Sequence, residues 1–393
     1  MRLKSFVILA AVTAVVTVAA VVVHTGTPTT TEVAAGEKLF PDLGSELGNV
    51  TRIEVAQHGE SFAIVREADD WVLRERAGYR VDPNVVKRVL SALVEMETVE
   101  AKTDKPEAYP RIQVEDVTAK AAKSIQIVLK DAAGKDVARL LVGKSRPSRT
   151  ASDTDRLYVR RPGEAQSWLV KSSLSLEKDP IRWLDRKVVD IARDRVVRVA
   201  TSQPDGSRLV LAKDKPGEDG KFEIQGKVPD GMKPKSAGDL AAPAGALASL
   251  DLDDVKRVAD VDFAKKPVGE AQYTTIDGLV VSVRMSEVDG TVWSIVSASV
   301  DESVRPAPAK SEAETKSDGA EKADAKPEED KAAADKKPAD EPAKPAIKPL
   351  DEVRKEAEAI NARVKGWAYK LPSYALDQLR TKMADMVEKE TSS

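Results

Sequence analysis

The chain has 393 residues, 32% of them charged, and its formal net charge at pH 7 is only −3. This balance gives no sign of nucleic acid or an anionic membrane surface as a partner. The sequence has no cysteine and only two histidines, His24 and His58. It therefore excludes disulfides, thiolate nucleophiles, Cys-ligated zinc and a lipidated cysteine, and it leaves little material for histidine chemistry.

An uncharged apolar run, residues 6–23, follows Arg2 and Lys4 at the N-terminus. As a helix it would span roughly 27 Å, close to the thickness of the hydrocarbon core of a bilayer. Basic residues before the run favour an orientation that places the body outside the cytoplasm. We therefore expect residues 1–24 to form a single-pass transmembrane anchor, followed by a spacer at residues 25–48.

A cleaved signal peptide is the alternative interpretation of this segment. The nearest small-residue site, Val33-Ala34-Ala35, lies well beyond the apolar run, which is an awkward position for cleavage. A buried core helix is less favoured, because the segment is apolar on every face.

The body contains an internal repeat. Two stretches, beginning at Asn49 and at Arg195, share one order of predicted elements. In each, an alternating strand turns into a second strand and then into a third that carries an aromatic residue, Trp71 or Phe222. This alternation, with turn residues between the strands, predicts a three-stranded meander in both places.

A helix is expected after each meander. In the first stretch, Asp82 as N-cap and Pro83 at the first helical position begin the run VDPNVVKRVLSALVEME, whose apolar residues recur at spacings of three and four. The counterpart in the second stretch contains Pro243 and Gly245, so we expect a short or broken helix there.

Further strands follow both helices. A hairpin that turns at Ala133-Gly134 is matched with one that turns at Asp289-Gly290. The last strand of each copy carries a tryptophan, Trp168 or Trp367, and these two are expected to fill equivalent core positions. Trp367 is reached only after a long interruption in the second copy.

That interruption, residues 301–348, consists almost wholly of Ala, Lys, Glu, Asp and Pro. Such a composition cannot bury enough apolar surface to offset the entropy of ordering, so we expect a disordered insertion. It is either an inert entropic loop or a segment whose mixed charges reach the cell wall or another partner.

Together these patterns predict an α+β fold, in which two tandem related units of antiparallel sheet plus helices are preceded by one N-terminal transmembrane helix. The first unit is expected at residues 49–192. The second is expected at residues 193–300 and 349–393, on either side of the insertion.

The Trp71 hairpin, the helix DPNVVKRVLSAL, the pair LLVG and LYVRR, and the closing EAINARVKGWAYKLPSYALDQL together resemble domain-of-unknown-function family 4340. The resemblance covers essentially the whole body and implies a membrane-anchored bacterial protein, single-pass in the inner membrane, with its body in the periplasm. It further implies an auxiliary role beside gliding-motility-type ABC transporters. The family has no established activity and no catalytic residues to carry over.

Few residues stand out as a candidate surface. Trp183, near an expected helix end, could belong to an exposed patch, although core packing is the commoner fate of tryptophan. Lys144, Arg146 and Arg149 follow Gly143 in an expected loop and could hold a phosphate or an anionic cell-wall polymer. A plain solvated loop is the favoured alternative for this basic group.

Three functions are compatible with these patterns. The leading hypothesis is a non-catalytic interaction module that serves a membrane transporter, with an ABC permease or auxiliary subunit as partner and with no cofactor or metal. The second is a periplasmic protein that binds a glycan or a lipid. A hydrolase that uses carboxylates alone is least favoured, since no recognisable carboxylate pair is present.

Overall fold

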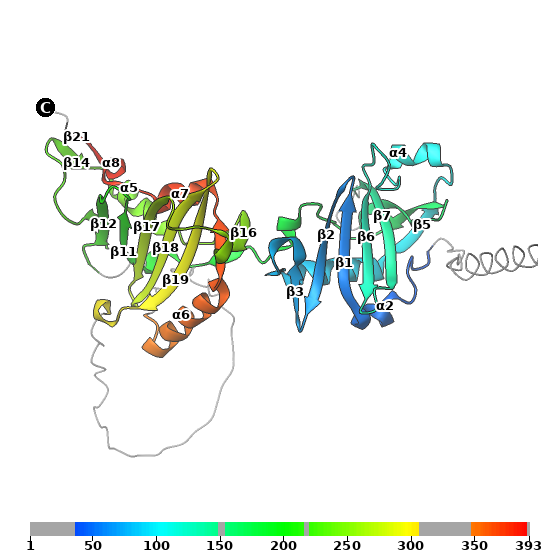
Figure 1. Cartoon of the computed structure of the whole chain (residues 1–393), viewed down its shortest axis with the longest axis horizontal. Coiled ribbons are helices and arrows are strands. Elements are labelled where there is room, and N and C mark those ends of the chain that lie inside the picture. The colour runs from blue at the N-terminus through cyan, green and yellow to red at the C-terminus, as the bar shows by residue number, and fades with distance from the viewer. Residues whose placement is uncertain (1–35, 148–153, 216–219, 306–346, 391–393) are drawn as a thin grey trace, which may run out of the picture. The chain divides into compact units, whose positions relative to one another are not determined.

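The computed structural model of the chain describes residues 36–147, 154–215, 220–305 and 347–390 (Figure 1). The expected anchor at residues 6–23 and most of the expected insertion lie outside these ranges. Among the described residues, no helix combines the length and the apolar character needed to cross a bilayer. Contacts divide the chain between Asp185 and Arg186 into unit 1 and unit 2, whereas the sequence predicted a boundary at residue 192.

Unit 1 contains one nine-stranded antiparallel sheet in the order β4-β3-β2-β1-β6-β7-β8-β9-β5. Its elements in chain order are α2 (Leu43–Glu46), η1 (Leu47–Asn49), β1 (Val50–Gln57), β2 (Glu60–Glu67), β3 (Asp70–Leu73), η2 (Arg74–Arg76), β4 (Tyr79–Arg80), α3 (Pro83–Glu95), β5 (Glu97–Ala101), η3 (Pro106–Ala108), α4 (Tyr109–Ile112), β6 (Ile125–Asp131), β7 (Asp136–Arg146), β8 (Arg156–Arg160), β9 (Ser167–Lys171) and η4 (Pro180–Trp183).

The longest helix among the described residues of unit 1, α3, begins where the sequence predicts. The carboxylate of Asp82 accepts a hydrogen bond from the backbone nitrogen of Asn84 at 2.8 Å, and Pro83 occupies the first turn. The face that carries Val86, Val89 and Leu93 is buried. The predicted N-cap and apolar stripe are therefore confirmed.

Unit 2 contains an eight-stranded antiparallel sheet in the order β13-β12-β11-β17-β18-β19-β20-β16, together with the strand pairs β10-β15 and β14-β21. Its elements are β10 (Lys187–Val189), η5 (Arg193–Arg195), β11 (Val196–Ser202), β12 (Arg208–Lys213), β13 (Phe222–Ile224), β14 (Met232–Pro234), α5 (Ala237–Ala241), η6 (Ala242–Gly245), β15 (Leu250–Asp251), β16 (Asp254–Arg257), η7 (Val258–Asp260), β17 (Pro267–Thr275), β18 (Leu279–Val288), β19 (Thr291–Val300), η8 (Glu302–Val304), α6 (Leu350–Val364), β20 (Trp367–Lys370), α7 (Ser373–Leu379), α8 (Met383–Met386) and β21 (Val387–Lys389).

The two large sheets share one strand order. From β3 to β5, the sheet of unit 1 runs β3-β2-β1-β6-β7-β8-β9-β5, and unit 2 runs β13-β12-β11-β17-β18-β19-β20-β16. The correspondence reaches single residues, because the register of the first strand shifts between Val50 and Arg52 in unit 1 and between Val196 and Arg198 in unit 2. The expected α+β fold of antiparallel sheets plus helices is confirmed.

One expected match within the repeat is wrong by one strand. The hairpin of β6 and β7, which turns at Gly134, corresponds in sheet order to β17 and β18, which turn at Gly278 rather than at Gly290. The equivalent turn glycines, Gly134 and Gly278, both have positive φ, +80° and +89°. The sequence of β17, PVGEAQYTT, carries Pro267 and Gly269 at its start and lacks a clear apolar alternation, so its pattern did not indicate a strand.

The strand of Trp367 joins the large sheet of unit 2 although it follows the insertion. In β20, Tyr369 pairs with Ser294 of β19, and Trp367 pairs with Arg257 of β16. Trp168 pairs in the same way with the edge strand β5 of unit 1. The two tryptophans are therefore equivalent in strand pairing, but Trp367 is buried and Trp168 is only half-buried.

Candidate functional site

Helix α6 brings the chain back to the large sheet of unit 2 after the insertion, and it packs against β19 (Figure 1). Its buried residues, Val353, Ala357 and Val364, recur at helical spacing and form the face turned to the sheet. Glu356 precedes Ala357 on the helix, and about a fifth of its side chain is exposed.

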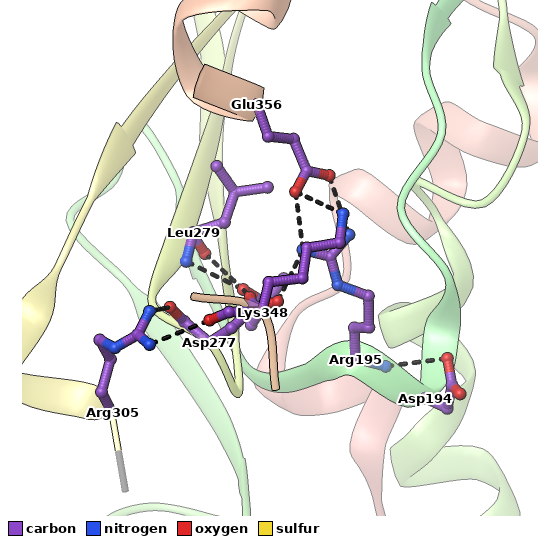
Figure 2. Close-up of polar contacts among 8 residues, drawn as sticks. Asp194, Arg195, Asp277, Leu279, Arg305, Lys348 and Glu356 are labelled. Carbon is purple, nitrogen blue, oxygen red and sulfur yellow. Dashed lines mark hydrogen bonds and ion pairs between the residues drawn. The ribbon is translucent and has the colours of Figure 1, made fainter. Parts of the chain in front are cut away.

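The carboxylate of Glu356 forms a two-point ion pair with Arg195, at the start of β11 (Figure 2). Nη1 of Arg195 lies 2.8 Å from Oε1 of Glu356, and Nη2 lies 3.0 Å from Oε2. The same Nη2 lies 2.9 Å from Oδ2 of Asp277. One guanidinium therefore joins two carboxylates that come from distant parts of the chain.

Asp277 lies in the tight turn between β17 and β18, and none of its side chain is exposed. The hydroxyl of Thr275 donates a hydrogen bond to Oδ1 of Asp277 and accepts one from the backbone nitrogen of Leu279 at 2.9 Å. Gly278 completes the turn, and a Cβ there would lie 2.6 Å from the backbone oxygen of Asp301. The turn is thus closed on itself and packed against the chain that leaves β19.

Residues at both ends of the insertion bind to this turn and to α6 (Figure 2). Arg305 donates from Nη1 to the backbone oxygen of Asp277 at 2.7 Å, and from Nη2 to the backbone oxygen of Lys348 at 2.9 Å. Nζ of Lys348 lies 2.8 Å from Oε2 of Glu356. We call Arg195, Asp277, Arg305, Lys348 and Glu356 the neck cluster.

The contacts within the neck cluster favour the charged forms of Glu356 and Arg195. Burial alone would raise the pKa of Glu356, but hydrogen bonds from Arg195 and Lys348 outweigh it, and the pKa lies below its usual value. Burial likewise opposes the charge of Arg195, but Glu356 and Asp277 raise its pKa. At neutral pH Glu356 and Arg195 are therefore an ion pair, which is suited to holding chain segments together rather than to transferring protons.

A pocket of about 340 Å³ lies in unit 1 against α3. The helix contributes Val85, Arg88 and Val89 to it, and the segment after β9 contributes Ser173, Ser175, Glu177 and Arg182. A second pocket of unit 1, of about 430 Å³, is lined by residues that include Phe62, Glu75 and Lys178.

Trp183 does not lie on a surface, which corrects the expectation of an exposed patch. None of its area is exposed, and its ring meets that of Phe62 edge-on with the centroids 6.1 Å apart. Its indole nitrogen donates to the backbone oxygen of Glu177 at 2.9 Å. The capped turn before it, which begins at Asp179 and Pro180, directs the ring inward.

The expected basic loop is also different in the structure. Lys144 and Arg146 belong to the end of β7, because this strand continues its pairing with β8 as far as Arg156. Both side chains are exposed, and Nζ of Lys144 donates to the backbone oxygen of Arg111 at 2.7 Å. Arg149 lies outside the described residues.

The sequence did not indicate the neck cluster, because residues 195, 277 and 356 are far apart in the chain and share no local motif. The only signal was the pair Asp277-Gly278, which predicts a turn but not its partners. Within the ranges that the structure covers, no group of three or more His, Cys, Asp or Glu side chains is arranged to hold a metal ion.

Comparison with known families gives one match. The family model described as Domain of unknown function (DUF4340) matches residues 71–266, about half of the chain. The matched residues run from β3 of unit 1 to the residue before β17 of unit 2. This match supports the family that the sequence resembles. No curated protein matches the chain.

Proposed function

We propose that this chain, which matches the family of unknown function over residues 71–266, is a non-catalytic interaction module. It is anchored in the bacterial inner membrane by residues 6–23, its body lies in the periplasm, and it serves as an accessory to an ABC-type transporter complex. The observation that supports the proposal best is the strand order shared by the two large sheets.

The shared strand order favours descent of both units from one duplicated α+β scaffold. The copies differ in what is attached to the scaffold. Unit 1 carries the long helix α3 and its pocket, whereas unit 2 carries α6 and the neck cluster. When copies of one fold keep a common sheet but differ in the helices and loops added to it, they can bind different partners.

The neck cluster supports an interaction role for the insertion. Arg305 and Lys348 are joined by a hydrogen bond of 2.9 Å, so residues 306–346 leave and re-enter unit 2 at one place. A partner bound by these residues would be held to the body through two attached ends rather than one. The proposed membrane and transporter context is supported by the apolar N-terminal run and by the resemblance to the family.

The test is purification of the tagged full-length chain from crosslinked membranes, followed by identification of the proteins that accompany it. A version in which a Gly-Ser-Gly linker replaces residues 306–346 serves as the matched control. We expect a transporter permease or auxiliary subunit with the full-length chain. A chain that is recovered alone, and as a monomer, would contradict the proposal.

A second candidate function is binding of a periplasmic glycan or lipid. The two pockets of unit 1, of about 340 and 430 Å³, favour it, because both fall in the size range of small-molecule sites. Purification from membranes followed by lipid and sugar analysis of the isolated protein distinguishes the two functions. A stoichiometric small molecule would favour this candidate, whereas a protein partner alone would favour the first.

A further inference from the structure

The pocket against α3 is built from a segment that is attached to the helix at both ends. We call residues 172–183 the return segment. At its start, the hydroxyl of Ser172 lies within hydrogen-bond range of the backbone oxygen of Ala92, at 3.5 Å. At its end, the backbone oxygen of Trp183 accepts a hydrogen bond of 2.8 Å from the nitrogen of Asp82, the N-cap of α3.

Internal bonds hold the return segment in shape. Asp179 caps the turn η4 by accepting from the backbone nitrogen of Ile181 at 2.9 Å. The buried ring of Trp183 fixes the far side of the loop through its hydrogen bond to the oxygen of Glu177. Arg182, which lies within η4, and Arg88, on α3, are therefore presented by two elements that are bonded to one another.

The lining of the pocket combines charge with an apolar floor. Arg88 and Arg182 line the pocket and are exposed, whereas Val89, which also lines it, is buried. Ser173 and Ser175 add two hydroxyl groups. Guanidinium groups bind carboxylate and phosphate oxygens at two points, and hydroxyls can donate to the same oxygens.

We propose that this pocket binds one small molecule that carries a single carboxylate or phosphate group. Arg88 and Arg182 hold the oxyanion, the serine hydroxyls bind further polar atoms, and the two valines contact the body of the ligand. A volume of about 340 Å³ exceeds what a bare ion fills, so the pocket accommodates a molecule the size of a sugar acid or a sugar phosphate.

Glu177 sets the charge that the pocket prefers. It belongs to the same lining, so two arginines and one glutamate surround the pocket. This net charge of +1 suits a ligand with one anionic group, carboxylate or phosphate, and disfavours a ligand with several such groups, which would meet the carboxylate of Glu177. The proposal concerns unit 1 alone and is independent of the transporter role.

The test is chemical modification of arginine by phenylglyoxal in the full-length chain, with the modified residues quantified by mass spectrometry. Sodium phosphate and sodium D-glucuronate are the two probes, and they distinguish a phosphate ligand from a carboxylate ligand. Each probe that binds will reduce modification of Arg88 and Arg182 but not of Arg66, an exposed arginine on β2. Protection by phosphate alone, by glucuronate alone or by both supports the proposal.

Variants test the roles of the charges. Arg88→Gln and Arg182→Gln are each expected to weaken binding of the protecting probe by roughly 1.5-fold to fivefold, the range of one exposed ion pair. Glu177→Gln is expected to strengthen it, and Arg66→Gln to leave it unchanged. Equal protection of Arg66, or no protection of Arg88 and Arg182 by either probe at millimolar concentration, would overturn the proposal without affecting the transporter hypothesis.

Discussion

Arg305 and Lys348 stand on opposite sides of residues 306–346, yet Nη2 of Arg305 donates a hydrogen bond of 2.9 Å to the backbone oxygen of Lys348. Nη1 of the same guanidinium binds the backbone oxygen of Asp277, and the ammonium of Lys348 binds Glu356. The two ends of the insertion are thus fixed to each other and to the sheet before the chain enters α6. Closure of the fold does not depend on the residues between them.

Replacement of residues 306–346 by Gly-Ser-Gly is therefore expected to leave unit 2 folded. Since closure entropy varies only with the logarithm of loop length, the free energy of unfolding should rise by up to about 2 kcal/mol. Chemical denaturation followed by tryptophan fluorescence measures the change. The same replacement combined with Arg305→Gln should lose part of this gain in the free energy of unfolding. Failure of the first variant to fold would contradict the interpretation that the neck cluster holds the two ends of the insertion together.

Arg195→Gln tests the centre of the neck cluster. The variant leaves Asp277 buried without its charged partner and removes both bonds to Glu356, so we expect the free energy of unfolding to fall by about 3 kcal/mol. Arg198→Gln, an exposed arginine on β11, is the matched control and should change it by less than about 0.5 kcal/mol. Equal effects of the two substitutions would show that the ion pairs contribute little.

The cluster also predicts how stability depends on pH. The folded-state pKa of Glu356 lies below its usual value of 4.5, so the unfolded chain takes up this proton first as the pH falls. The contribution of Glu356 is therefore complete at pH values above 4.5 and is lost as the pH falls through the lower, folded-state value.

Glu356→Gln should accordingly flatten the acid limb of the stability curve measured by denaturation between pH 6 and pH 3. Among the residues that the structure describes, four other carboxyl groups have a lowered pKa: Glu97, Asp190, Asp205 and Asp301. They are present in both proteins, so the difference between the two curves isolates Glu356. Parallel curves for the two proteins over this range would exclude the predicted linkage.

Elements whose formation depends on neighbouring residues could be predicted from local signals in the sequence. Asp82 and Pro83 predicted the start of α3 because capping depends on neighbouring residues alone. The sequence also predicted that Trp367 returns to the sheet, since the tryptophan of β9 offered a template for β20. Strand β17 was missed because its neighbours in the sheet, rather than its own alternation, make it a strand.

The candidate sites depend on distant contacts, and little of them could be predicted. Arg195 and Glu356 meet only after the sheet has formed and α6 has packed on it. The burial of Trp183 follows from contact with Phe62 in a strand far along the chain. The sequence singled out Trp183 but not Arg195 or Glu356, because pairing between remote segments decides whether a side chain is buried or exposed.

Gly143 offers a last test, in unit 1, of a close approach between two chain segments. Its φ is ordinary, but a Cβ at this position would overlap the backbone oxygen of Ile112 and lie 2.8 Å from that of Gln113. Since backbone cannot move aside as a side chain can, Gly143→Ala should lower the free energy of unfolding by about 2 kcal/mol. Gly48→Ala, where nothing lies within 4 Å of the added Cβ, is the control and should be neutral or slightly stabilising. Denaturation curves of the two variants measure the difference, and a stable Gly143→Ala protein would show that the segment carrying Ile112 does not pack closely on β7.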